Sequence, residues 1–151
     1  MKNNSVKSMI ERFLENKNNI MKEEIEVWKF GNTDGMADKL GDLVLSGKKI
    51  GTSSDYMLYN NEDELPKINT YSLITNSKDE ALCIIKTLNV EIIDFNKATK
   101  EHAFKEGEGD LSHKYWYDVH RKFFKKEREK KGLKFTEDMK IVFETFEVVF
   151  R

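Results

Sequence analysis

Apolar side chains recur at helical spacing in three long segments of the chain. In residues 5–16 they form one stripe, which predicts an N-terminal helix. Residues 33–46 show the same spacing, begin with Thr33 and Asp34, either of which can cap a helix, and are followed by Gly47. Ser112 is a suitable N-cap for a longer helix over 112–131. The predicted inner face of that last helix carries Trp116, Val119, His120 and Phe123.

Other segments have the residue types and spacing of strands. Residues 25–30 are short and aromatic, and 70–75 follow a proline turn and are extended in character. Residues 140–150 are β-branched and aromatic, which favours a well-paired strand. The alternating run 81–95 is long for one strand, so we expect a bend or bulge at Asn89.

The order of these elements determines the expected fold class. A short hydroxyl-rich strand after Gly47 and a short helix over 99–106 complete the series. Helices and strands do not alternate regularly, so the prediction is an α+β fold with a mostly antiparallel sheet or small β-barrel flanked by helices. At 151 residues one core is expected, with residues 1–24 as an N-terminal helical extension of a domain over 25–151.

Composition excludes several classes of protein. The single cysteine, Cys83, rules out an intrachain disulfide framework and a cysteine-based zinc site. No run of apolar residues approaches the roughly 18 that a membrane span needs. The first residues lack the apolar core of a signal peptide, and Glu11 and Glu15 argue against a transit peptide. We therefore expect a cytoplasmic protein without a membrane partner.

The charges nearly cancel overall but are unevenly distributed. The chain has 26 Lys and Arg against 27 Asp and Glu, yet residues 113–134 carry nine basic side chains and three acidic ones. Such a segment is either a solvated helix face or a surface that attracts phosphates. The sequence leaves both interpretations open.

One further segment combines lysines with hydroxyl groups. Residues 47–54 contain two lysines followed by Thr52, Ser53 and Ser54. A lysine beside a hydroxyl can activate it as a nucleophile. Lys49 and Thr52 would point to opposite faces of a regular strand, and they converge only if the backbone turns or bulges at Gly51. The alternative is an exposed basic loop.

The candidate metal ligands are weak. Residues 106–110 place carboxylates at alternate positions, but the twelfth position of such a calcium loop would be Tyr117 rather than glutamate. His102 and Glu106 lie one helical turn apart without a third ligand at suitable spacing, and His120 is typical of a core histidine with one hydrogen bond. We expect no metal and no other cofactor.

Five short motifs follow one another along the chain. They are WKFG at 28–31, ADKL at 37–40, LVLSGKKIGT at 43–52, TKEHAFKEGEGD at 99–110 and FTED at 135–138, and they are accompanied by Ser112, Trp116, His120, Phe123 and Phe124. Together these segments resemble the ASCH domain, in particular a longer bacterial branch once described only as a domain of unknown function. The resemblance covers about residues 26–150.

This resemblance implies a fold and a site. ASCH domains are similar to PUA domains, small β-barrels whose cleft is expected to bind RNA or a modified nucleoside. In a smaller branch a Lys-x-x-Thr pair and a later Glu serve an amidohydrolase that acts on 4-acetylcytidine. These positions fall on Lys49, Thr52 and Glu106, with Thr52 as nucleophile, Lys49 as base and Glu106 orienting the lysine or protonating the leaving amine.

The remaining site residues expected in this basic cleft are substrate-binding. They are Lys48, Ser53, Ser54, Tyr56, Ser112, Trp116 and His120. The alternative function implied by the same resemblance is a non-catalytic RNA-binding module or a ribonuclease that uses this cleft.

Overall fold

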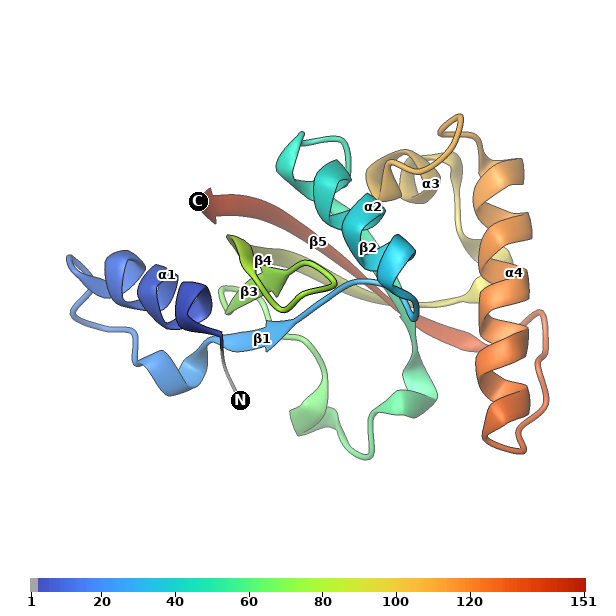
Figure 1. Cartoon of the computed structure of the whole chain (residues 1–151). Helices are drawn as coiled ribbons and strands as arrows, with labels where there is room; N and C mark the ends of the chain where they lie inside the picture. Colours follow the sequence, from blue (N-terminus) through green and yellow to red (C-terminus); the bar gives the residue numbers. More distant parts are fainter. Residues whose placement is uncertain (1–2) are drawn as a thin grey trace.

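The computed structural model of the chain describes residues 3–151 as helices packed on one curled, five-stranded sheet (Figure 1). The α-helices are α1 (Asn4–Leu14), α2 (Asp34–Leu45), α3 (Lys100–Glu106) and α4 (His113–Lys130). The strands are β1 (Glu26–Trp28), β2 (Gly51–Asp55), β3 (Tyr71–Thr75), β4 (Ala81–Asp94) and β5 (Lys140–Phe150).

The sheet is a mostly antiparallel half-barrel. Its strand order is β1-β3-β4-β5-β2, and the β1–β3 pair alone is parallel. The short strands β1 and β2 are therefore the two edges, and the curl of the sheet leaves an opening between them. This architecture confirms the predicted α+β class.

The longest strand, β4, bends at the position expected from the sequence. Its register with β5 shifts between Thr87 and Asn89, which confirms an irregularity at this point. One continuous strand can thereby pair with both β3 and β5 while the sheet curls.

The helix boundaries follow the predicted caps closely. The Thr33 hydroxyl accepts the Met36 amide of α2, and the Ser112 hydroxyl accepts the Tyr115 amide of α4. The N-terminal helix is slightly shorter than expected, because α1 ends at Leu14. Local sequence signals were thus sufficient to place these helix starts.

Each helical region covers a different part of the sheet. Helix α1 packs at one end and α4 stands at the other, while α2 and α3 lie above the sheet in the view of Figure 1. The apolar stripe of α1 is buried against Ile25, Leu73 and Ile84. A separate apolar cluster joins α4 to the far end of the sheet through Phe95, Trp116, Phe124 and Ile141. Among the described residues, no helix is long and apolar enough to cross a membrane.

Candidate functional site

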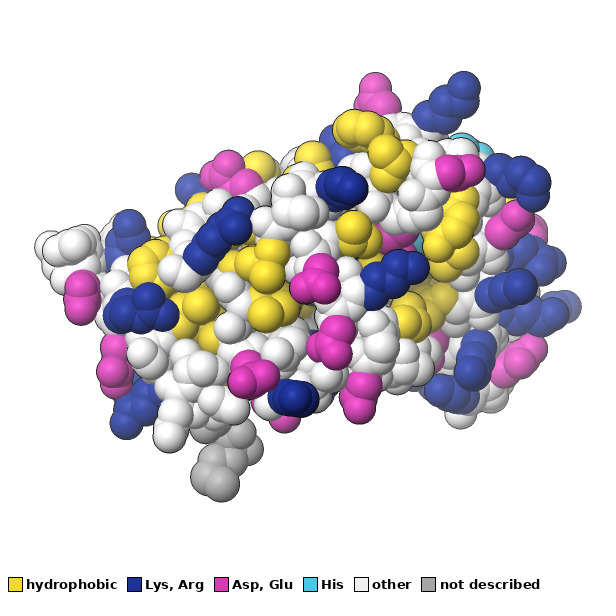
Figure 2. All heavy atoms as spheres, turned by 45° about the horizontal axis from the view of Figure 1, so that its top comes forward, with side chains coloured by type: hydrophobic (Ala, Val, Ile, Leu, Met, Phe, Trp, Pro, Cys, Tyr) yellow, Lys and Arg dark blue, Asp and Glu magenta, His cyan; other side chains and the backbone are white. Residues whose placement is uncertain are grey.

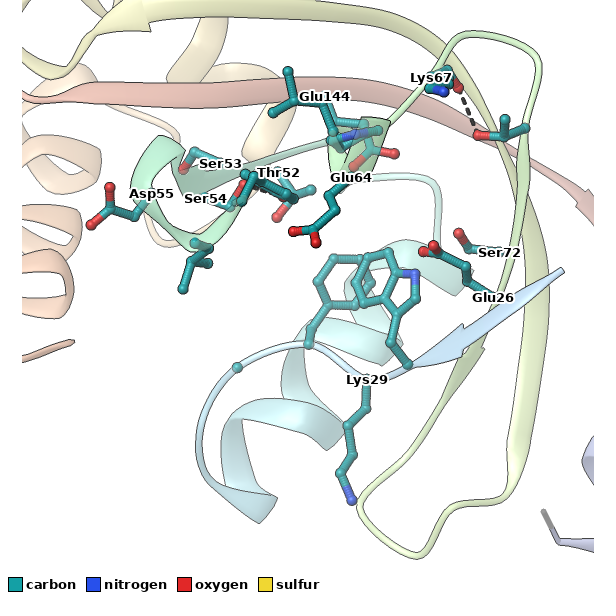
Figure 3. Close-up of a pocket in the computed structure, with 18 of the residues that line it drawn as sticks. Glu26, Lys29, Thr52, Ser53, Ser54, Asp55, Glu64, Lys67, Ser72 and Glu144 are labelled. Atoms are coloured by element: carbon teal, nitrogen blue, oxygen red, sulfur yellow. Dashed lines mark hydrogen bonds between the residues drawn. The ribbon is translucent and has the colours of Figure 1, made fainter. Parts of the chain in front are cut away.

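A cleft of about 840 Å³ opens between the two edge strands (Figure 3). Strands β1 and β2 form its walls, the connection from β2 to β3 closes one side, and the C-terminal half of α4 closes another. Its aromatic lining includes Trp28, Phe30, Tyr59 and Tyr71. A concave site that combines aromatic side chains with placed polar groups is typical of a small-ligand site.

The cleft is not basic, which corrects the expectation from the sequence. Its lining contains three lysines, Lys29, Lys67 and Lys131, against seven carboxylates. The carboxylates are Glu24, Glu26, Asp55, Asp63, Glu64, Glu127 and Glu144. The expectation failed because one of the two lysines before β2 turns into the core, and the connection from β2 to β3 brings acidic side chains instead.

Beside the cleft, Lys49 and Glu106 form a buried ion pair. Both residues are 1% exposed, although 57 positions separate them in the chain. Lys49 Nζ donates to Glu106 Oε1 at 2.9 Å and to Glu108 Oε2 at 3.2 Å, and it lies 5.4 Å from the centre of the Phe30 ring. Burying such a pair carries a large desolvation penalty. Ionisable groups whose pKa values are perturbed by burial and by a charged partner are common at functional sites.

The second oxygen of Glu106 is the centre of a hydrogen-bond network. Glu106 Oε2 accepts the Ser53 hydroxyl at 2.6 Å and the indole N–H of Trp116 at 2.8 Å. His120 Nε2 lies 3.2 Å from the same oxygen, and His120 Nδ1 lies 2.8 Å from the Trp116 carbonyl. His120 is thus a buried histidine as predicted, but it contacts two partners instead of one.

The network keeps its members charged. Burial alone would lower the pKa of Lys49, but the Glu106 and Glu108 carboxylates raise it above its ordinary value. Burial would likewise raise the pKa of Glu106, yet Lys49 and His120 hold it well below the usual range. The pKa of His120 is raised by Glu106 against the effect of burial. Both pKa shifts favour the ammonium form of Lys49 and the carboxylate form of Glu106.

Thr52 lies on a different face of β2 from this network. Strand β2 pairs regularly with β5 from Gly51 to Asp55, so its side chains alternate and no bulge turns Thr52 towards Lys49. Figure 3 shows Thr52 and Ser53 pointing to different sides of the strand. Of the three residues that the resemblance implies, the structure joins Lys49 to Glu106, and the hydroxyl that contacts Glu106 is that of Ser53.

The other predicted binding residues are spread around the domain. Ser53 and Ser54 line the cleft, and the Ser54 hydroxyl lies 2.9 Å from that of Tyr59. Lys48 is exposed, and Tyr56 begins a short 3-10 helix after β2. Ser112 caps α4, where its hydroxyl is engaged by the backbone.

The carboxylates and the histidine around Lys49 could in principle hold a metal ion. Glu106, Glu108 and His120 place one ligand atom each within 4.8 Å of one another. The Lys49 ammonium already bridges the two carboxylates, and its positive charge disfavours a divalent cation there. His102 does not join Glu106, because its Nε2 lies 3.5 Å from Glu91.

Sequence reasoning missed most residues of the cleft, and two of them are Tyr59 and Glu144. Tyr59 belongs to the connection after β2, and Glu144 is the Cα partner of Thr52 on β5. An aromatic residue in an acidic loop carries no local signal for a site. Glu144 is a charged residue within a β-branched and aromatic run, and this feature of the sequence could have indicated a site residue.

The basic segment forms one exposed side of the molecule. Lys122, Lys125, Lys126 and Lys130 are exposed on α4, and Figure 2 shows blue side chains gathered at the end of the molecule where α4 lies. Arg128 is different, because it is buried and binds both oxygens of Asp55 at 2.8 and 3.0 Å. Lys131 lies between the two environments, since it lines the cleft and is exposed.

A curled, mostly antiparallel sheet with a cleft between its edge strands and helices beside it defines a PUA-like α+β domain. The model of the ASCH domain matches residues 26–150, and the chain belongs to the ASCH domain family. The fold of this family is that of PUA-like RNA-binding modules.

Solved structures agree with this assignment. The chain is similar to the ASCH domain from Lactobacillus crispatus JV V101, with 29% identity, a TM-score of 0.90, and coverage of 99% of this chain and 97% of that one. It is also similar to protein EF3133 from Enterococcus faecalis V583, of the family of unknown function DUF984. That match has 36% identity, a TM-score of 0.86, and coverage of 97% and 88%. A search of curated proteins found no match.

Proposed function

We propose that this ASCH domain binds a nucleoside unit of RNA, with the base in the cleft and the neighbouring phosphates on α4. The observation that carries the proposal is the separation of charge: a cleft rich in carboxylates and aromatic rings adjoins a lysine-covered helix. Phosphates are repelled by the first surface and attracted by the second. A nucleotide offers a matching division between its base and its backbone.

The cleft supplies suitable partners for a base. Trp28 is half-buried at its wall, and its ring packs edge-on against Phe30 with centroids 4.6 Å apart. Stacking of a base on an exposed aromatic ring contributes about 1–3 kcal/mol. The hydroxyls of Thr52 and Ser54 lie on β2 within the cleft and offer hydrogen bonds to the sugar or the base.

The test is binding of a fluorescent single-stranded RNA over a range of salt concentrations. We expect affinity to fall with salt, with a slope of about −0.7 for each phosphate that is neutralised. Reversing the charge of Lys125 and Lys126 should reduce that slope. The same change at Lys7, an exposed lysine of α1 at the other end of the domain, is the control and should leave the slope unchanged.

Trp28→Ala should weaken binding without altering the salt slope, because it removes stacking and no charge. Binding that is independent of salt and of both α4 lysines would disprove the placement of phosphates on α4. Cleavage of the RNA by the wild-type protein would instead support a ribonuclease.

A second candidate function is hydrolysis of the acetyl amide of 4-acetylcytidine. It is favoured by the contact of Lys49 with Glu106 and by Ser53, a residue of the cleft lining whose hydroxyl donates to Glu106 at 2.6 Å. Because the raised pKa of Lys49 favours its ammonium form, the proton acceptor in this proposal is Glu106 rather than Lys49. Glu106 takes the hydroxyl proton as the serine oxygen bonds to the acetyl carbon, and it returns the proton to the amino nitrogen as the carbon–nitrogen bond breaks and cytidine leaves. Water then hydrolyses the acetyl ester to acetate and restores the hydroxyl. Lys49 then holds the carboxylate in place.

Incubation with 4-acetylcytidine and chromatographic detection of cytidine tests this reaction. If Ser53 is the nucleophile, Ser53→Ala should abolish release while Thr52→Val retains part of it. The opposite result would assign the nucleophile to Thr52, as the resemblance implies. Lys49→Met should lose release in either case, and circular dichroism should establish that each variant is folded.

A further inference from the structure

Glu144 is a buried carboxyl whose position connects the core of the sheet with the cleft. It lies on β5, is 9% exposed, and is the Cα partner of Thr52 across the β2–β5 pair. Directly opposed residues on an antiparallel pair share one face, so both side chains belong to the cleft wall. Figure 3 shows Glu144 beside Thr52 at the cleft.

Among the described residues, one of the two carboxyl oxygens of Glu144 has a hydrogen-bond partner. The Thr87 hydroxyl donates to Glu144 Oε1 at 2.6 Å and fixes the side chain. Within residues 3–151, Thr87 is the hydrogen-bond partner of Glu144 and no lysine, arginine or histidine forms an ion pair with it. Oε2 has no hydrogen-bond partner in the part of the chain that the structure describes, and it is not a fully buried atom, so it is accessible from the cleft to a donor of a ligand.

The surroundings select the kind of donor. Burial raises the pKa of Glu144, and the Glu26 carboxylate of the same cleft adds to that effect. Acidic groups here exclude phosphate from this end of the cleft, whereas the half-buried Trp28 offers aromatic surface to a flat ring. The complementary ligand part is a planar heterocycle with an N–H at its edge.

We propose that Glu144 determines specificity in the cleft by accepting a hydrogen bond from the exocyclic amino group of a nucleobase. The inference rests on the proposed binding of a nucleoside and deepens it by naming the chemical class. A cytosine base presents an amino group where a uracil base presents a carbonyl oxygen, and a glutamate is a suitable acceptor for the former. With uracil, Glu144 Oε2 would lie next to a carbonyl oxygen, and two hydrogen-bond acceptors repel each other.

The experiment compares cytidine with uridine as probes for the full chain, using calorimetry or quenching of tryptophan fluorescence. The two nucleosides have nearly the same size, so a difference in affinity reports the edge of the base. We expect the wild-type protein to bind cytidine about ten- to a hundredfold more tightly, the range for discrimination of one base by a well-placed side chain.

Glu144→Gln is the informative variant because it keeps the size of the side chain and the acceptor for Thr87. Its amide then presents N–H groups to the cleft, which should weaken cytidine binding and strengthen uridine binding. Glu147→Gln makes the same chemical change at an exposed position of β5 outside the cleft lining and should leave both affinities unchanged.

The experiment distinguishes failure of the role of Glu144 from failure of the proposed nucleoside binding. A preference for cytidine that Glu144→Gln removes or reverses supports the assignment. Binding of both nucleosides with a ratio that Glu144→Gln does not alter overturns the role of Glu144 but retains the cleft as a nucleoside site. Failure of the folded wild-type protein to bind either nucleoside overturns both.

Discussion

Replacing Lys49 with methionine should destabilise the domain more than any nearby surface change. The substitution keeps the length and apolar stem of the side chain but removes the ammonium from a pair whose side chains are 1% and 2% exposed. Glu106 would remain buried without its nearest counterion. Removing one partner of a buried ion pair costs about 3–5 kcal/mol.

The expected magnitude lies in the lower part of that range, because three other groups still touch Glu106. Ser53, Trp116 and His120 keep their contacts with Oε2, 2.6 to 3.2 Å away. For a chain of this size each kcal/mol corresponds to roughly 2–4 °C in Tm, so we expect a fall of roughly 6–12 °C. Chemical denaturation followed by circular dichroism provides the matching free energy of unfolding.

The dependence on pH gives a second readout of the same pair. The pKa of Glu106 is lowered in the folded protein, so its contribution is present above the pKa of an unfolded glutamate and is lost as pH falls through the folded value. Without Lys49 the pKa of Glu106 should rise, which moves the acid-induced loss of stability to higher pH. Lys48→Met is the matched control, because Lys48 is exposed.

A Lys49→Met protein within about 1 kcal/mol of the wild type would refute this reasoning. The double variant with Glu106→Gln sharpens the test, since it removes the unpaired charge as well. We expect it to recover part of the stability that the single variant loses, as buried pairs replaced by uncharged groups often do.

Three further predictions concern the framework of the site. Arg128→Lys should cost about 1–3 kcal/mol, because it breaks a buried two-point contact with a carboxylate; Arg121→Lys on the exposed side of the same helix should change the unfolding free energy by less than 1 kcal/mol. Gly107→Ala should destabilise strongly, since an added Cβ would lie 2.2 Å from a backbone oxygen. Gly47→Ala, with a similar positive φ and open space, should cost only about 1 kcal/mol in the same unfolding assay. In an NMR titration the His120 imidazole should show a midpoint above the ordinary value of 6.5, and a midpoint below it would contradict the charged network.

The sequence by itself determined the local elements of this protein. Apolar periodicity and hydroxyl caps placed α2 and α4, and Asn89 marked the irregularity in β4. These features depend on interactions between residues a few positions apart, which a linear pattern records directly. The quoted motifs also identified the family, because their order along the chain is itself a linear property.

Only the tertiary structure decided which side chains form the site. Lys49 meets Glu106 because α3 packs beside the start of β2, and the regular pairing of β2 with β5 sends Thr52 to the cleft and Ser53 to Glu106. Glu144 reaches the cleft through the same register. A shift of one residue would exchange the faces of β2, and strand register is determined by burial of the whole sheet rather than by any local pattern. The negative charge of the cleft was also decided by the tertiary structure, because it depends on which charged side chains the packing brings together.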